Sequence, residues 1–399
     1  MHRSAGGSAL VSCLLVCLAA ACGGRTAGSG GPGSGDDGSS GAGGSGGGSR
    51  GGETAGEGGS AEPPLLTTGK LDLLFVIDNT SQMVGVTDYL QASVPALFDR
   101  LLNPECLDGG GNVLGPSSGG ACATGQLEFA PVADIHVGIV TSSLGGRGGD
   151  QCNPTATNPA NPALNAHNDD RGELVNRTAP DDAPLADASP SNFLAWFPQG
   201  QPAPPVQAIG AASQLVGDFQ SMVGGVGPQG CGFTSPLEAW YRFLVQPDPY
   251  ASVVREGTRA TYQGVDGTIL QQRHDFLRPD SAVAIVVVAN ENDRTADPPS
   301  LDGQGWAFSN QDFPGSPNGS APEGSIECRT SPEDPNCTSC AFLQSAPAFA
   351  TRCPKDGANG VDGYLDPVDD SINLRFFHMK QRFGVDVEFP IARYVDGLT

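Results

Sequence analysis

A near-continuous run of apolar positions lies between Lys70 and Ile77, where leucine, β-branched and aromatic side chains follow one another almost without interruption. Such a run is typical of a strand that is covered on both faces of a parallel sheet. The run stops at Asp78, after which Asp78, Thr80 and Gln82 alternate with other residues. Because open α/β sheets bind ligands just past the carboxyl ends of their strands, we expect these polar side chains to converge there.

The rest of the chain carries helical and strand patterns in turn. Apolar residues recur at three- and four-residue spacings in three segments, which predicts helices over 84–102, 206–223 and 372–383. Shorter apolar runs predict strands over 135–141 and 283–288, and a strand or extended segment over 385–389. Together these elements predict an α/β fold, with a doubly wound, mostly parallel sheet flanked by helices and interrupted by long loop insertions.

Several local features add to this outline. Pro95 lies inside the first helical pattern and predicts a kink or a restart of the helix. The segment 142–199 is rich in Asn, Pro, Asp and Gly and is expected to be a long surface insertion, anchored at Trp196 and Cys152. His136 has no second histidine at metal-binding spacing, so we expect a half-exposed strand residue there.

The N-terminus has the features of an export signal. A basic start is followed by an apolar stretch from Ala9 to Ala21, which is too short to span a bilayer and suits the core of a signal peptide. The ending Ala19–Cys22 resembles a bacterial lipobox, which implies that the leader is removed and that Cys22 carries the lipid. Ordinary signal cleavage near the same place is the alternative.

Composition then sets the domain boundaries. Residues 1–22 form the predicted signal peptide, and residues 23–69 consist mainly of Gly and Ser and are expected to be a disordered linker that cannot bury apolar area. Residues 70–399 form the predicted globular domain. The lipobox-like ending and the tether predict an exported lipoprotein of the cell envelope, with the outer membrane as the expected location.

The first polar loop carries a family resemblance. The stretch KLDLLFVIDNTSQM, residues 70–83, resembles the first motif of the von Willebrand factor type A domain, in which an Asp and two hydroxyl side chains bind a divalent metal ion. The resemblance assigns Asp78 and Thr80 to such a site. Gln82 stands where the family has a serine, so an amide replaces a compact hydroxyl ligand. An Asx-type turn without a ligand is the alternative interpretation of this loop.

Two later stretches resemble the other motifs of the same family. In GCGFTSPLEA, Thr234 or Ser235 before Pro236 predicts a hydroxyl cap at the start of a helix, and the resemblance makes the same hydroxyls ion ligands. The strand over 283–288 is followed by Asn290, where the family has an Asp. Asp293 or Glu291 is expected to compensate by reaching the ion directly or through water.

The resemblance covers residues 70 to about 399 and implies a Mg²⁺ or Ca²⁺ site with little negative charge. Because Asp78 is the one carboxylate among the matched ligands, we expect weak binding, with a dissociation constant of about 10⁻⁴ to 10⁻³ M. The family usually has two more strands after the one near 283, and one candidate is present at 385–389. Either that segment completes the sheet or the chain is truncated.

The net charge limits the expected binding partners, and the cysteine content indicates disulfides. The formal net charge of −23 repels nucleic acids and anionic lipid, so no nucleic-acid partner is expected and the membrane is reached through the lipid anchor alone. Beyond residue 22 the chain has eight cysteines, which in an exported protein predict disulfides rather than zinc ligands. They are Cys106, Cys122, Cys152, Cys231, Cys328, Cys337, Cys340 and Cys353. Cys106 with Cys122 is the first expected pair, and the other pairings stay open.

The sequence leaves three candidate functions. The first is a lipoprotein that displays a type A-like domain for adhesion or protein binding, with an unknown protein partner. The second is a structural envelope protein whose type A-like fold no longer binds metal. The third, an exported hydrolase, is disfavoured because the five histidines form no pair at catalytic or metal spacing and no strand-borne nucleophile motif is present, so we expect no enzyme.

Overall fold

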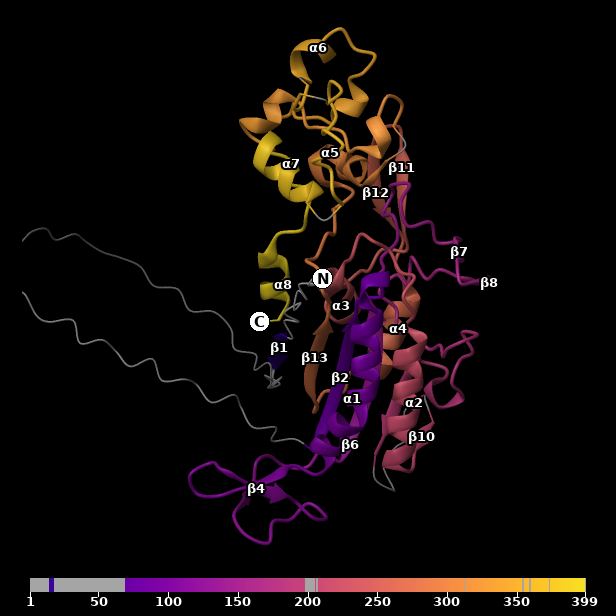
Figure 1. The fold of residues 1–399 in the computed structure, drawn as a ribbon, viewed down its shortest axis with the longest axis vertical. Helices are drawn as coiled ribbons and strands as arrows, with labels where there is room; N and C mark the ends of the chain where they lie inside the picture. The colour runs from indigo at the N-terminus through magenta and orange to yellow at the C-terminus, as the bar shows by residue number, and fades with distance from the viewer. Residues whose placement is uncertain are drawn as a thin grey trace, which may run out of the picture.

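The structure is a computed structural model that describes residues 14–17, 69–197, 205, 207–311, 313–353, 355–358, 360–372 and 374–398. The predicted linker 23–69 therefore lies outside the described residues except for its last residue, and so does the lipidation candidate Cys22. Within the described part of the chain, a six-stranded sheet in the order β1-β13-β2-β6-β9-β10 forms the centre (Figure 1).

The middle of this sheet is parallel. β2 (Lys70–Ile77) lies between β13 (Ala282–Val288) and β6 (Asp134–Thr141) and runs parallel to both. β9 (Phe193–Trp196) is antiparallel to β6, β10 (Ala208–Ile209) is parallel to β9, and β1 (Leu14–Cys17) is antiparallel to β13. The three strands predicted from apolar runs are confirmed, since residues covered on both faces of a sheet must be apolar at consecutive positions.

Helices cover both faces of the sheet. On one face, α1 (Val84–Leu102) and α2 (Ala212–Gly225) pack Phe98 and Phe219 against Phe75 of β2. On the other face, α3 (Pro236–Leu244) and α4 (Gly267–Phe276) pack Phe243 and Phe276 against the sheet, and α8 (Ile391–Gly397) joins them. The molecule is therefore a mixed α/β protein with a mostly parallel sheet flanked by helices.

Smaller elements extend from this body. They are β3 (Glu105–Leu107), β4 (Val113–Pro116), β5 (Gln126–Leu127), β7 (Thr157–Asn158), β8 (Asn161–Asn165), β11 (Ser252–Glu256) and β12 (Arg259–Gln263). Short 3₁₀ helices are η1 (Ser81–Met83), η2 (Ala186–Ala188), η3 (Gly305–Ser309), η4 (Pro317–Gly319), η5 (Ile326–Arg329) and η6 (Cys340–Phe342). Figure 1 shows β4 at the end of the molecule opposite α6.

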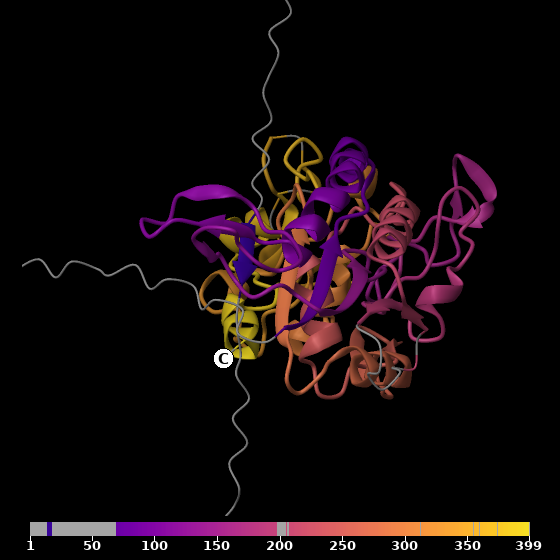
Figure 2. The ribbon, with the colours of Figure 1, turned by 90° about the horizontal axis from the view of Figure 1, so that it is seen from below.

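A C-terminal lobe, residues 300–390, follows β13 and contains α5 (Ser300–Gly303), α6 (Phe349–Arg352) and α7 (Arg375–Phe383). Phe376 and Met379 of α7 share a buried cluster with Cys231 and Phe233, the residues just before α3. This cluster attaches the lobe to the sheet domain near the carboxyl ends of the strands. Figure 2 shows the same ribbon turned by 90° and seen from below.

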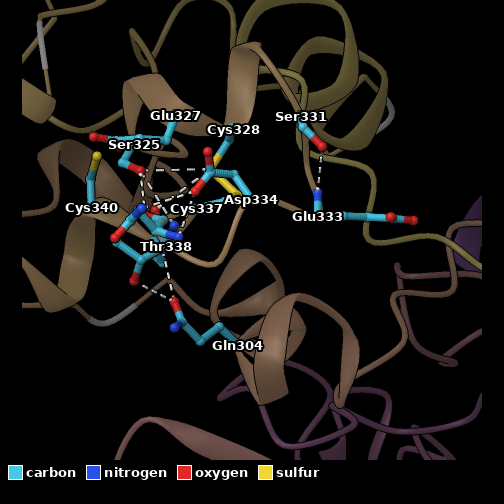
Figure 3. Close-up of a disulfide and its surroundings, with 12 residues drawn as sticks. Gln304, Ser325, Glu327, Cys328, Ser331, Glu333, Asp334, Cys337, Thr338 and Cys340 are labelled. Carbon is cyan, nitrogen blue, oxygen red and sulfur yellow. Dashed lines mark hydrogen bonds between the residues drawn. A yellow bond between two sulfur atoms is a disulfide. The ribbon is translucent and has the colours of Figure 1, made fainter.

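All eight cysteines beyond residue 22 form disulfides, and the expected pair Cys106–Cys122 is confirmed. The other three bridges are Cys152–Cys231, Cys328–Cys337 and Cys340–Cys353. Around Cys328–Cys337, the Ser325 amide donates to the Thr338 carbonyl (2.9 Å), and the Thr338 hydroxyl donates to Oε1 of Gln304 (2.7 Å; Figure 3). Two short bridges thus hold a lobe that has little regular secondary structure.

α1 continues through Pro95, which excludes a restart of the helix and leaves the kink as a prediction. Two other local predictions are corrected. The segment 142–199 is not wholly a surface insertion, because its residues 193–196 form β9 inside the sheet, while the expected anchor Cys152 is confirmed by its bridge to Cys231. His136 is 3 % exposed rather than half-exposed, because β6 is covered on both faces, and burial lowers its pKa to about 4.

The segment 385–389 does not complete the sheet. It makes a single isolated bridge, between Glu388 and Ala296, and its Val385 and Val387 are buried in the cluster around α7. The physical reason is that the apolar side chains of this segment find their burial in the C-terminal lobe. Among the described residues, the edge of β13 is met by β1 alone.

Candidate functional site

The loop after β2 is tied to both neighbouring strands through Asp78, which is fully buried. Its amide donates to the carbonyl of Val288 at the end of β13 (2.9 Å). Its Oδ1 accepts hydrogen bonds from the Thr80 amide (2.9 Å) and from the Ser142 hydroxyl, just past β6 (3.2 Å). The carboxylate therefore sits where three parallel strands end, as the sequence predicts.

Two polar atoms of this loop are buried without a hydrogen-bond partner among the described residues. They are the second carboxylate oxygen of Asp78, Oδ2, and the hydroxyl oxygen of Thr80, Oγ1. Leaving such atoms unpaired costs about 1 to 3 kcal/mol each, so a native structure normally satisfies them with water or an ion. A carboxylate oxygen and a hydroxyl oxygen are the ligand types that hard divalent cations accept.

Gln82 and Asn290, two of the ligands that the sequence analysis predicts, contact each other. The Asn290 Nδ2 group donates to Oε1 of Gln82 over 3.4 Å, and both side chains are exposed. The amide oxygen of Gln82 is therefore used in an internal hydrogen bond, and neither side chain adds a negative charge to the loop.

Thr234 and Ser235, the residues before α3, are buried, and the Thr234 hydroxyl is engaged by a backbone carbonyl. Thr234 donates from its hydroxyl to the carbonyl of Asn292 (3.1 Å), and the Ser235 amide donates to the carbonyl of Ser142 (2.8 Å). Neither side chain caps α3, so the expected hydroxyl cap is corrected, whereas Pro236 does begin the helix as predicted. These bonds join the loops after β6 and β13 to the start of α3.

Asp293 supplies the missing cap. Its Oδ2 accepts hydrogen bonds from the amides of Leu237 (2.8 Å) and Glu238 (3.2 Å), and its Oδ1 accepts one from the Thr295 amide (3.0 Å). Burial raises the pKa of Asp293, while these donors favour its charged form. Glu291 lies 2.8 Å from the guanidinium of Arg294. The two carboxylates that were expected to compensate for Asn290 are therefore held by other partners.

Three residues that the sequence analysis did not single out complete the polar cluster. Asn79 accepts a hydrogen bond from the hydroxyl of Ser143 on its Oδ1 (2.7 Å), and that hydroxyl accepts one from the Cys231 amide (2.8 Å). Ser142 contacts Asp78 directly. The sequence did carry a signal for the two serines. Ser142 and Ser143 directly follow the predicted strand 135–141, just as Asp78 directly follows the strand before it.

A cavity near these loops is lined in part by arginine side chains that have hydrogen-bond partners. It has a volume of about 540 Å³ and is lined in part by Arg147, Arg171, Arg242 and Tyr250. Arg147 donates to the hydroxyls of Tyr250 and Tyr262, at 2.7 and 3.0 Å. Arg171 and Arg242 both contact Oδ2 of Asp266, at 2.8 and 3.3 Å. The arginines mainly brace the loops next to the candidate site, and the cavity shares no residue with the predicted ligands.

The described residues contain no group of three or more His, Cys, Asp or Glu side chains that could hold a metal ion. In the loop after β2, the unpartnered buried oxygens are Oδ2 of Asp78 and Oγ1 of Thr80. No helix in the described part of the chain is long and apolar enough to cross a membrane.

These features define the class of the protein as a mixed α/β domain with a polar cluster at the carboxyl edge of a mostly parallel sheet. Comparison of the chain with protein-family models, with curated proteins and with solved structures found no match. The particular function therefore rests on the residues of this chain.

Proposed function

We propose that this protein is an exported lipoprotein whose type A-like α/β domain binds a protein partner at the carboxyl edge of its sheet. The order of the elements supports the type A-like assignment: β2 with its Asp78 loop, the Thr234–Ser235 loop before α3, and β13 with its polar loop come in the sequence that the resemblance implies. The net charge of −23 argues against nucleic acid as the partner.

The observation that carries the proposal is the pair of unpartnered buried oxygens on Asp78 and Thr80. In this proposal they take a Mg²⁺ or Ca²⁺ ion, together with water and with oxygens of the partner. A single carboxylate makes the site weak, because Ca²⁺ sites gain affinity from the number of charged ligands and Mg²⁺ sites normally use one or two carboxylates.

Calorimetric titration with Mg²⁺, Mn²⁺ and Ca²⁺ tests the ion. The wild type is expected to bind with a dissociation constant of about 10⁻⁴ to 10⁻³ M. Asp78→Ala abolishes binding, whereas Asp88→Ala, at an exposed position of α1, leaves it unchanged. The double variant Gln82→Ser with Asn290→Asp binds more tightly, because it adds a hydroxyl and a charge. If the wild type and the double variant both give flat titrations, the ion is refuted.

A structural envelope protein without an ion is the second candidate. The hydrogen bond from Asn290 to Gln82 favours it, since this bond satisfies two polar groups without a cation. Affinity capture from the cell envelope in the presence of Mg²⁺ or of a chelator separates the two functions. A partner that is retained equally in both conditions, by wild type and by Asp78→Ala, supports the structural role.

A further inference from the structure

Among the described residues, the outer edge of β13 is covered by β1 alone. Along one edge, the seven residues of β13 all pair with β2. Along the other edge, β13 pairs with β1 at four residues, and no other strand of the described chain lies there. β13 carries no charged residue and no proline, the two devices by which soluble proteins usually protect a strand edge.

The backbone direction shows which groups β1 covers. The carbonyl of Val288 accepts the Asp78 amide, so the backbone of Val288 faces β2. Strand residues alternate in this respect, and the N–H and C=O groups of Val283, Ile285 and Val287 therefore face outward. β1 belongs to the predicted leader. Apart from β1, no strand of the described residues lies beside these outward groups.

Apolar side chains flank the same edge. Ala284 and Val286 contribute to the core under α1 and α2, and Ile285 and Val287 to the core under α3, so both faces are apolar up to the edge. Figures 1 and 2 show α8 beside β1 at this edge. Ile391 and Val395, one helical turn apart on α8, are 66 % and 54 % exposed.

We propose that removal of the leader uncovers β13 and that β13 of a second copy of this chain then pairs with it in antiparallel orientation. The proposal rests on the leader removal that belongs to the proposed function. Two identical strands that pair antiparallel are related by a two-fold axis, the commonest symmetry of soluble oligomers. β1 already meets this edge in antiparallel orientation. The dimer joins two sheets into one and brings the α8 helices of the copies toward the same interface.

Sedimentation in a density-matched detergent, with mass spectrometry of the same samples, tests the proposal. The lipoprotein purified from membranes is expected to lack the leader and to sediment as a dimer. The Cys22→Ser chain, which keeps the leader and β1, is expected to sediment as a monomer. Hydrogen exchange of residues 282–288 is expected to be slow in both, since a strand covers the edge in each.

Variants locate the interface. Ile391→Lys with Val395→Lys, both at exposed positions, is expected to weaken dimerisation at least about tenfold and to speed exchange in 282–288. Val368→Lys, at a position 80 % exposed in the C-terminal lobe, is the matched control and is expected to leave the dimer intact. Val283→Pro removes an outward N–H near the start of β13 and is expected to weaken the dimer as well.

Three results overturn the proposal. A processed chain that is monomeric shows that the edge does not recruit a second copy. A dimer that is unaffected by the α8 and Val283 variants shows that the contact lies elsewhere. A purified wild-type chain whose mass still includes the leader shows that β13 stays covered, and in that case the mass identifies leader removal, rather than edge pairing, as the premise that failed.

Discussion

The carboxylate of Asp293, which follows β13, accepts a 2.8 Å hydrogen bond from the amide of Leu237 in the first turn of α3. A residue from a distant loop thus caps this helix and stabilises its unpaired amides. The bond also fixes the Thr234–Ser235 loop above the strands, because that loop leads directly into α3.

We therefore predict that Asp293→Ala lowers the free energy of unfolding by about 1 to 3 kcal/mol, since it leaves buried helix amides without an acceptor. Asp293→Asn keeps one acceptor oxygen and is expected to lose less. Urea unfolding followed by circular dichroism measures both. Equal stability of wild type and Asp293→Ala would contradict the capping role.

The buried ion pair between Glu238 and Arg393 gives a second prediction. Arg393 donates to both carboxylate oxygens of Glu238, at 3.0 and 3.1 Å, and Glu238 is fully buried. Arg393→Ala leaves a buried carboxylate without its cationic partner and is expected to lower the free energy of unfolding by about 3 to 5 kcal/mol. Arg393→Met with Glu238→Gln removes both charges and is expected to be more stable than Arg393→Ala in urea unfolding. The reverse order would show that the two side chains act independently.

Glu323 in the C-terminal lobe predicts a dependence of stability on pH. It is fully buried, both its carboxylate oxygens lack a partner among the described residues, and burial raises its pKa to about 9, with the negative charge of Asp356 adding to the effect. The folded state therefore holds a proton that the unfolded state releases above its pKa of 4.5. The stabilisation is complete below pH 4.5 and is lost as the pH rises to about 9.

Within that window the contribution of Glu323 falls by up to about 1.4 kcal/mol per pH unit. Glu323→Gln removes the titrating group and keeps the shape, so the difference in unfolding free energy between wild type and variant should decline steadily with pH. Urea titrations at several pH values measure this slope. A difference that is constant with pH would refute the assignment of a buried neutral carboxyl.

The disulfides differ in the length of chain that they close. Cys152–Cys231 spans 79 residues and Cys106–Cys122 spans 16. Loop-closure entropy predicts a stabilisation of about 4.5 kcal/mol for the first and about 3 kcal/mol for the second. The double variant Cys152→Ser/Cys231→Ser is expected to lose more stability than Cys106→Ser/Cys122→Ser. Thiol counting on unfolded, unreduced wild type should find no free thiol among the eight cysteines.

Lipidation at Cys22 is tested in cells. Labelling with a clickable fatty acid is expected to mark the wild type and to spare Cys22→Ser. Equal labelling of both proteins would place the lipid elsewhere, and absence of label from the wild type would remove the lipid anchor from the proposed function.

The sequence by itself determined the strands β2, β6 and β13, because residues covered on both faces of a sheet must be consecutively apolar, and that pattern is local. It also determined the position of Asp78 and the start of α3 at Pro236. The adjacent pair Cys106–Cys122 followed from proximity along the chain. In each case the signal lies in a short stretch of the chain, which is longest for the disulfide, with a separation of 16 residues.

The tertiary structure alone decided what depends on distant contacts. The four residues of β9 are too few for a periodic signal, and they join the sheet because β6 offers them an edge. Asp293 caps α3 and Asn290 meets Gln82 because folding brings separate loops together at the carboxyl ends of the strands. The spacing of polar residues along a chain indicates which side chains reach this edge. Which of them remain available for a ligand is decided by the hydrogen bonds that their neighbours in space have already taken.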